Sequence, residues 1–196
     1  MNQELLNQLE NLKQNDIDTR NKLAEEGRLY GMYAEEMQKV HIENAKALND
    51  LIEKHGWPGI SKVGPEGSRA AWLIAQHSIC TPDLQRKFLK HLSDAEKEGD
   101  VPSRQVAFLT DRIRFNEGKP QVYGTVYDWN ENGVLFCEVE DQGNIDEKRE
   151  TIGLPPFQES LQNEIAAIKA EGGGPPQDFK AYKQAAMQWA KSVGWQ

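Results

Sequence analysis

Apolar residues recur at helical spacing along most of the chain. Residues 3–30 carry leucine and isoleucine at rough helical intervals, which predicts one long or broken helix. The same periodicity predicts a second helix over residues 33–54, with His41 and Asn44 on its apolar face. These two polar side chains are therefore expected at an interior or a cleft.

Glycine and proline divide the rest of the helical pattern. A loop is predicted from His55 to Ser68, where the serine can cap a short apolar helix that ends at His77. His77 shares a face with apolar residues, so it too is expected to point inward. Further helices are predicted over residues 82–97, 103–114, 145–152, 155–170 and 179–193.

Period-two alternation marks residues 121–128 as a strand. A turn at residues 130–133 and a return strand over residues 134–139 would complete a β-hairpin. Alternation gives the first strand a polar-aromatic face that could line a site, made of Gln121, Tyr123, Thr125 and Tyr127.

These elements predict a mainly α fold (α+β): a single helical domain with one antiparallel β-hairpin packed against it. We expect an N-terminal helical extension over residues 1–34 and a core domain over residues 35–170. A Gly/Pro linker over residues 171–176 leads to a C-terminal amphipathic helix over residues 177–196. That helix is expected to dock on the body of the protein or on a second subunit of a homodimer.

Composition narrows the classes of partner. The chain has 23 Lys+Arg against 31 Asp+Glu, a net charge of −8, which argues against binding to nucleic-acid backbone. No apolar stretch is long enough for a membrane span and no secretory signal is recognisable, so we expect a cytoplasmic protein. Cys80 and Cys137 lack the spacing of a disulfide framework or a zinc site and are expected to be buried free thiols.

Candidate chemistry lies in polar residues that interrupt apolar or turn-rich segments. Each of these residues could instead have a purely structural role, as a hydrogen-bonded core histidine, an ion pair at a helix end, or a tyrosine that packs across strands. The predicted catalytic residues are His77, His41 and Asp111. The predicted substrate-binding residues are Arg112, Gln121, Tyr123, Thr125, Arg149, Gln76 and Asn44.

Several of these residues stand in short motifs whose order and spacing resemble a widespread bacterial domain family of unknown function. The motifs are His41-x-Glu-Asn44, His55-Gly-Trp-Pro58, Ala71-Trp-Leu-Ile-Ala-Gln-His77, Asp111-Arg-Ile113, Gly118-Lys-Pro-Gln121-x-Tyr-Gly-Thr125 and Arg149-x-x-x-Gly-Leu-Pro155. The resemblance covers about residues 35–160. It implies that the polar residues belong to one pattern, and it implies no activity.

Three hypotheses follow if these residues share a cleft, which requires Tyr123 to lie near His77. The first is a hydrolase or transferase that needs no cofactor and acts on a small phosphorylated or nucleotide-like anion by histidine acid–base chemistry. The second is a binding or interaction module without catalysis. The third is a metal-dependent enzyme with His41, His77 and Asp111 as ligands, although no short ligand motif is present and nearby arginines oppose a cation.

Overall fold

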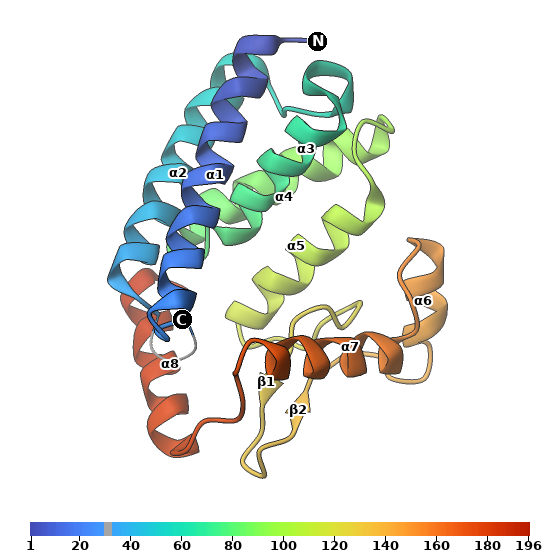
Figure 1. Ribbon diagram of the computed structural model, residues 1–196. Helices are drawn as coiled ribbons and strands as arrows, with labels where there is room; N and C mark the ends of the chain where they lie inside the picture. Colours follow the sequence, from blue (N-terminus) through green and yellow to red (C-terminus); the bar gives the residue numbers. More distant parts are fainter. Residues whose placement is uncertain (30–32) are drawn as a thin grey trace. The chain divides into compact units, whose positions relative to one another are not determined.

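The computed structural model describes residues 1–29 and 33–196 (Figure 1). In these residues the chain forms eight helices and one two-stranded antiparallel hairpin, and 66% of it is helical. The predicted mainly α fold with a small hairpin is therefore confirmed. Throughout the described part of the chain, each helix is too short or too polar to cross a lipid bilayer.

The chain divides into two compact units, Met1–Leu109 and Thr110–Gln196. The first unit contains α1 (Gln3–Glu25), α2 (Glu35–His55), α3 (Ile60–His77), α4 (Pro82–Lys97) and the first half of α5 (Ser103–Asn116). The second contains the end of α5, β1 (Asp128–Trp129), β2 (Leu135–Phe136), α6 (Ile145–Thr151), α7 (Phe157–Ala170) and α8 (Phe179–Val193).

The first unit is a helical bundle in which α1 packs on α2 and α3, and α4 packs on both α2 and α3. Its fully buried apolar side chains include Leu5, Leu9, Leu48, Ile74 and Phe88. Leu5, Leu9, Leu48 and Ile74 are among the residues whose helical spacing predicted their helices, because burying one stripe of each helix removes apolar surface from water. The predicted extension over residues 1–34 and helix over 3–30 include residues 30–32, which lie outside the described residues.

The predicted loop from His55 to Ser68 is wrong beyond Gly59. Helix α3 begins at Ile60 and continues past a kink at Gly64, whose φ is 74°. Pro65 starts the segment after the kink, a position where a helix tolerates its missing N–H. Ser68 is a buried residue within the helix rather than its N-cap.

The start of α3 is held by Asp100 instead. The carboxylate of Asp100 accepts hydrogen bonds from the backbone N–H and the hydroxyl of Ser61, at 2.6 and 2.9 Å. A Cβ on Gly59 would lie 1.9 Å from this carboxylate, so the close approach requires glycine there.

The predicted hairpin is correct at its turn, but both strands are shorter than predicted, and β2 covers only Leu135–Phe136 of the predicted return strand over residues 134–139. Asp128 pairs with Phe136 and Trp129 with Leu135, while residues 122–127 form no regular strand. In this segment several backbone N–H groups donate to side chains rather than to a partner strand. Gly124, at φ 63°, also departs from extended geometry. The polar-aromatic face predicted from alternation therefore does not form, and Gln121 is buried while Tyr123 and Thr125 are half-buried.

Side chains at the start of α6 and on α8 make specific contacts within the second unit. Asn144 precedes α6 without capping it, and its amide nitrogen donates to the carboxylate of Asp141. In α8, Tyr182 donates to Asp128 at 2.5 Å and Lys183 lies 3.1 Å from the same carboxylate, so this helix docks on β1 of its own chain. Cys80 is buried and Cys137 half-buried, and neither forms a disulfide with another described residue. Burial raises the pKa of Cys137 to about 12, so this thiol is unreactive at neutral pH.

Candidate functional site

A buried carboxylate lies between two histidines in the first unit. Asp16 on α1 is 1% exposed. Its Oδ2 atom lies 2.8 Å from Nδ1 of His77, at the end of α3, and 3.3 Å from Nε2 of His41 on α2. The two imidazole rings are 5.0 Å apart between centroids. Three helices thus contribute one ionisable side chain each to a single cluster, here called the Asp–His–His cluster (Asp16, His41 and His77).

Local structure explains why these three side chains meet. Leu9, Asp16 and Leu23 follow one another at seven-residue spacing, so the carboxylate lies on the buried stripe of α1. Asn44 ties α2 to α1, because its side-chain nitrogen donates to the carbonyl of Leu12 at 3.0 Å.

The end of α3 is fixed by two buried glutamines. The side-chain nitrogen of Gln85 donates to the carbonyls of Ala75 and Gln76 in the last turn, at 2.8 and 3.1 Å. Gln76 in turn donates to the carbonyl of Phe108 at 3.2 Å. These bonds satisfy carbonyls that a helix end leaves without partners, and they hold His77 in place.

The two histidines keep the Asp16 carboxylate ionised. Burial alone would raise the pKa of Asp16, but hydrogen bonds from His41 and His77 and their Coulomb attraction lower it well below the usual range of an aspartate. At neutral pH Asp16 is therefore an acceptor only.

Hydrogen bonding then defines where the protons lie. The carboxylate accepts from Nδ1–H of His77, Nε2 of His41 lies 3.3 Å from the same oxygen, and the hydroxyl of Tyr33 contacts Nδ1 of His41. With its proton on Nδ1, a neutral His77 carries its lone pair on Nε2. The side chain of His77 is 31% exposed, against 8% for His41, so His77 is the member of the cluster that a ligand can reach.

The cluster opens into a pocket of about 200 Å³. Apart from the cluster and Tyr33, its lining consists of two arginines and a set of apolar side chains: Arg20, Arg28, Leu23, Leu29, Ala34 and Met37. Arg28 also forms ion pairs with Glu26 and Glu36 at 2.8 and 2.9 Å. A guanidinium group in the wall of a pocket is able to bind phosphate or carboxylate through paired hydrogen bonds.

The same cluster has the composition of a metal site. Asp16, His41 and His77 each offer one ligand atom, and these atoms lie within 4.8 Å of one another. Ligands at about 2.0–2.2 Å from one ion lie at most about 4.4 Å apart. The distances from Asp16 to the two histidines, 2.8 and 3.3 Å, meet this limit. Two imidazoles and a carboxylate suit a transition-metal dication.

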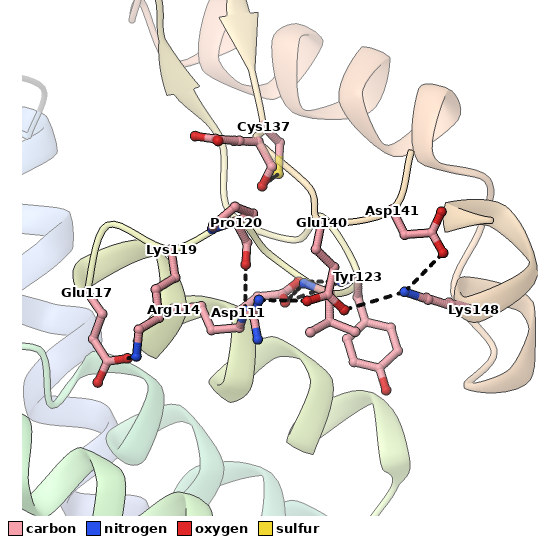
Figure 2. Close-up of polar contacts among 12 residues, drawn as sticks. Asp111, Arg114, Glu117, Lys119, Pro120, Tyr123, Cys137, Glu140, Asp141 and Lys148 are labelled. Carbon is pink, nitrogen blue, oxygen red and sulfur yellow. Dashed lines mark hydrogen bonds and ion pairs between the residues drawn. The ribbon is translucent and has the colours of Figure 1, made fainter. Parts of the chain in front are cut away.

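The other predicted catalytic residue, Asp111, organises a loop of the second unit. Its carboxylate accepts hydrogen bonds from the backbone N–H groups of Val122, Tyr123 and Thr125 at 2.8–3.2 Å and from the hydroxyl of Thr125 at 3.1 Å. Burial raises the pKa of Asp111, although these hydrogen bonds act in the opposite direction. Figure 2 shows Asp111 and Tyr123 among the neighbouring ion pairs.

Arg149 and Gln121 hold the same loop from other sides. Arg149 donates to the carbonyls of Tyr123, Gly124 and Pro155 at 2.6–3.0 Å and to the hydroxyl of Ser160. Gln121 accepts from the N–H groups of Thr125 and Val126 and donates to the carbonyl of Val126. These contacts favour a structural role for both residues.

Charged side chains continue around this loop. Arg114 contacts the carboxylate of Glu140 at 2.7 Å, and Lys148 lies 3.5 Å from Glu140 and 3.6 Å from Asp141 (Figure 2). Arg114 also donates to the carbonyl of Pro120 at 2.5 Å. The partly exposed pairs contribute little stability individually, but together they fix the start of the loop on α5.

The predicted site residues thus fall into two groups. His41, His77, Asn44 and Gln76 belong to the first unit, and Asp111, Arg112, Gln121, Tyr123, Thr125 and Arg149 to the second. Each group lies within its own unit. A site shared by His77 and Tyr123 stays a prediction, as does an anion-binding role for Arg112 and Arg149.

Sequence reasoning missed Asp16. The one local signal was an acidic residue seven positions from both Leu9 and Leu23, on the apolar stripe of the first helix. The metal-site hypothesis named the right histidines of the cluster but placed Asp111 where the structure has Asp16.

Comparison with known proteins identifies a family for this chain but no individual relative. Curated proteins and solved structures offer no match to this chain. A family profile matches residues 1–170, from the N-terminal helix with Asp16 through α7. The chain therefore belongs to a family of unknown function, DUF6624.

Proposed function

We propose that the pocket beside the Asp–His–His cluster binds a small anionic compound, phosphorylated or nucleotide-like, and that His77 transfers a proton there in a hydrolase or transferase reaction. The observation that carries this proposal is the 2.8 Å contact between Nδ1 of His77 and the buried carboxylate of Asp16. It orients the imidazole and directs Nε2 away from the carboxylate.

The roles of the two residues follow from their chemistry. His77 accepts a proton at Nε2, and the negative charge of Asp16 stabilises the imidazolium that forms. Asp16 does not take the proton itself, because its pKa lies well below the usual range. A positioned acid–base group of this kind typically contributes about 10²–10⁴-fold to a rate.

Charge and size support an anionic ligand. Arg20 and Arg28 line the pocket, and a guanidinium group binds phosphate or carboxylate through paired hydrogen bonds. A volume of about 200 Å³ limits the ligand to a small molecule or to the anionic end of a larger one. Leu23 and Met37 provide an apolar surface for its uncharged part.

The second candidate function is a metal-dependent enzyme, favoured by the three ligand atoms within 4.8 Å. Asp16, His41 and His77 would then hold a dication such as Zn²⁺ or Fe²⁺, and the arginines would bind an anionic substrate beside it. Such an ion would supply Lewis-acid chemistry at the position of the Asp16–His77 contact.

The first test compares anion-induced shifts in melting temperature. Inorganic phosphate, nucleoside monophosphates and small carboxylates are titrated into the wild type, Arg20→Met and the control Arg104→Met. We expect at least one anion to stabilise the wild type and the control but not Arg20→Met. No stabilisation by any of these anions, or equal stabilisation of all three proteins, would reject the anion site.

The second test separates proton transfer from metal chemistry and from binding alone. The chain has four histidines, and His91 on α4 lies outside the cluster, so His91→Ala is a matched control for His77→Ala and His41→Ala. Phosphate release from a panel of phosphate esters is measured after chelation and with added Zn²⁺ or Fe²⁺. Turnover that survives chelation and is lost only in His77→Ala supports the proposal. Turnover that requires the metal supports the second candidate, and anion binding without turnover supports a binding module.

A further inference from the structure

A second pocket lies in the other unit, against helix α8. It has a volume of about 400 Å³, within the range of sites that hold drug-sized ligands. Its apolar wall includes Phe115, Val126, Phe136, Met187 and Trp189. Most of one side comes from α8, which follows residue 170, where the family match ends.

The rim of this pocket is unusually apolar for a surface. Phe136 is 39% exposed and Met187 is 50% exposed, and both are among the large apolar side chains that the described residues leave open to water. They come from β2 and α8, and both line the same pocket. Exposed apolar side chains gathered at one concave place mark a binding site more often than scattered ones do.

One polar group in the wall has no partner within the described part of the chain. Asn116 is 8% exposed, and its side-chain nitrogen is buried without a hydrogen-bond acceptor. A buried donor without an acceptor costs free energy, which a carbonyl or ether oxygen of a ligand would recover.

The charges around the pocket already balance. Lys183 pairs with Asp128 at 3.1 Å, and Lys119 pairs with Glu117 at 2.7 Å. Among the lining residues, two lysines face two carboxylates, those of Asp128 and Glu138. An anionic ligand would therefore have to displace the carboxylate partner of one of these lysines, whereas a neutral ligand would not.

We propose that this pocket is a binding site for a small neutral molecule with an aromatic or aliphatic body and one hydrogen-bond acceptor. The body contacts Phe136 and Met187, and the acceptor receives the hydrogen bond of Asn116. This pocket shares no lining residue with the pocket of the Asp–His–His cluster, so this proposal does not depend on the proposed function.

The neutral naphthyl ketone dye prodan is the probe, because it combines an aromatic body with a carbonyl acceptor. Its emission shifts to the blue in an apolar site, and titration gives Kd. We expect saturable binding to the wild type, with a shift of the Met187 methyl resonance. Met187→Lys should weaken binding at least tenfold, and because Met187 is half-exposed this variant should fold.

Val134→Lys is the matched control. Val134 lies in the same hairpin, is 55% exposed and does not line the pocket. Its substitution should leave Kd unchanged. Binding that does not saturate, or that weakens equally in Val134→Lys and Met187→Lys, would overturn the proposal.

Asn116→Leu tests the polar contact separately. It should weaken binding of prodan but not of the same naphthylamine without the ketone, which can be measured by competition. Equal effects on both compounds would overturn the role of Asn116. If Asn116→Leu fails to fold, the comparison of the two compounds in the wild type decides, because the hydrogen bond requires tighter binding of the ketone.

Discussion

Asp16 and His77 are 61 positions apart in the sequence, yet Nδ1 of His77 lies 2.8 Å from a carboxylate oxygen of Asp16. The contact joins the first helix of the bundle to the end of the third. It is buried on the Asp16 side and partly open on the His77 side, which is the arrangement that a carboxylate needs in order to orient a reactive imidazole.

Replacing Asp16 by Asn should destabilise the first unit. Both imidazoles approach the same oxygen, Oδ2 of Asp16, and an amide oxygen in that place lacks the negative charge that strengthens these contacts. We expect a loss of about 2–3 kcal/mol in the free energy of unfolding, measured by urea denaturation. Asp18→Asn, at an exposed position on the same helix, should cost less than about 0.5 kcal/mol. Equal losses in the two variants would show that Asp16 is not a specific partner of the histidines.

The stability contribution of Asp16 should depend on pH. Hydrogen bonds from His41 and His77 outweigh burial and lower its folded-state pKa below the unfolded value of about 3.9. The contribution is therefore complete above about pH 4 and is lost as the pH falls through the folded-state pKa. The difference in unfolding free energy between the wild type and Asp16→Asn should shrink as the pH falls below about 4. A difference that grows as the pH falls below about 4 would contradict this direction of the pKa shift.

Removing the carboxylate of Asp111 should unravel the loop over residues 121–126. Asp111→Ala leaves the N–H groups of Val122, Tyr123 and Thr125 without their acceptor, and we expect a loss of roughly 3 kcal/mol or more. Hydrogen exchange should accelerate at these three amides. Glu131→Ala, which removes an exposed carboxylate from the same unit, is the control and should leave their exchange unchanged.

Thr125→Val is a milder probe of the same network. It removes one hydroxyl donor to Asp111 and keeps the backbone bonds, so the expected loss is about 1 kcal/mol. Proteolytic cleavage within residues 121–126 should rank Asp111→Ala above Thr125→Val and Thr125→Val above the wild type. Faster cleavage of Thr125→Val than of Asp111→Ala would show that the threonine hydroxyl stabilises the loop more than the carboxylate does.

Arg149→Lys should destabilise the second unit without affecting anion binding in the first. Lysine cannot reach the carbonyls of Tyr123, Gly124 and Pro155 together, so we expect a loss of about 2–3 kcal/mol in unfolding free energy. Arg104→Lys, at an exposed site, should be nearly neutral. The anion-binding role expected from the sequence requires a different result, namely loss of anion-induced stabilisation in Arg149→Lys at unchanged stability.

The periodicity of apolar residues in the sequence was sufficient to predict most of the helices. The segments from Pro82 to Lys97 and from Phe179 to Val193 end within a residue or two of their expected positions, because a buried stripe and a terminal proline or glycine are local signals. The hairpin turn was also local: Oδ1 of Asn130 accepts from the N–H groups of Asn132 and Val134, which closes the turn within five residues.

Local sequence patterns predicted the wrong secondary structure where a side chain distant in the sequence accepts hydrogen bonds from the backbone. Residues 121–127 alternate like a strand, but the carboxylate of Asp111 captures three of their N–H groups, so the strand begins only at Asp128. Likewise, Asp100 accepts a hydrogen bond from the backbone of Ser61 at the start of α3, 39 positions earlier in the sequence. Residues after Gly59 therefore form a helix where the sequence predicted a loop.

The amino-acid sequence by itself determined the helical fold, the position of the hairpin turn and the inward direction of His41 and His77, because each depends on spacing within one element. Only the tertiary structure decided that Asp16 lies between these histidines and that Asp111 serves a loop instead. A hydrogen bond between side chains on different helices depends on how the helices pack, and packing is set by the whole buried surface of the unit rather than by any local pattern.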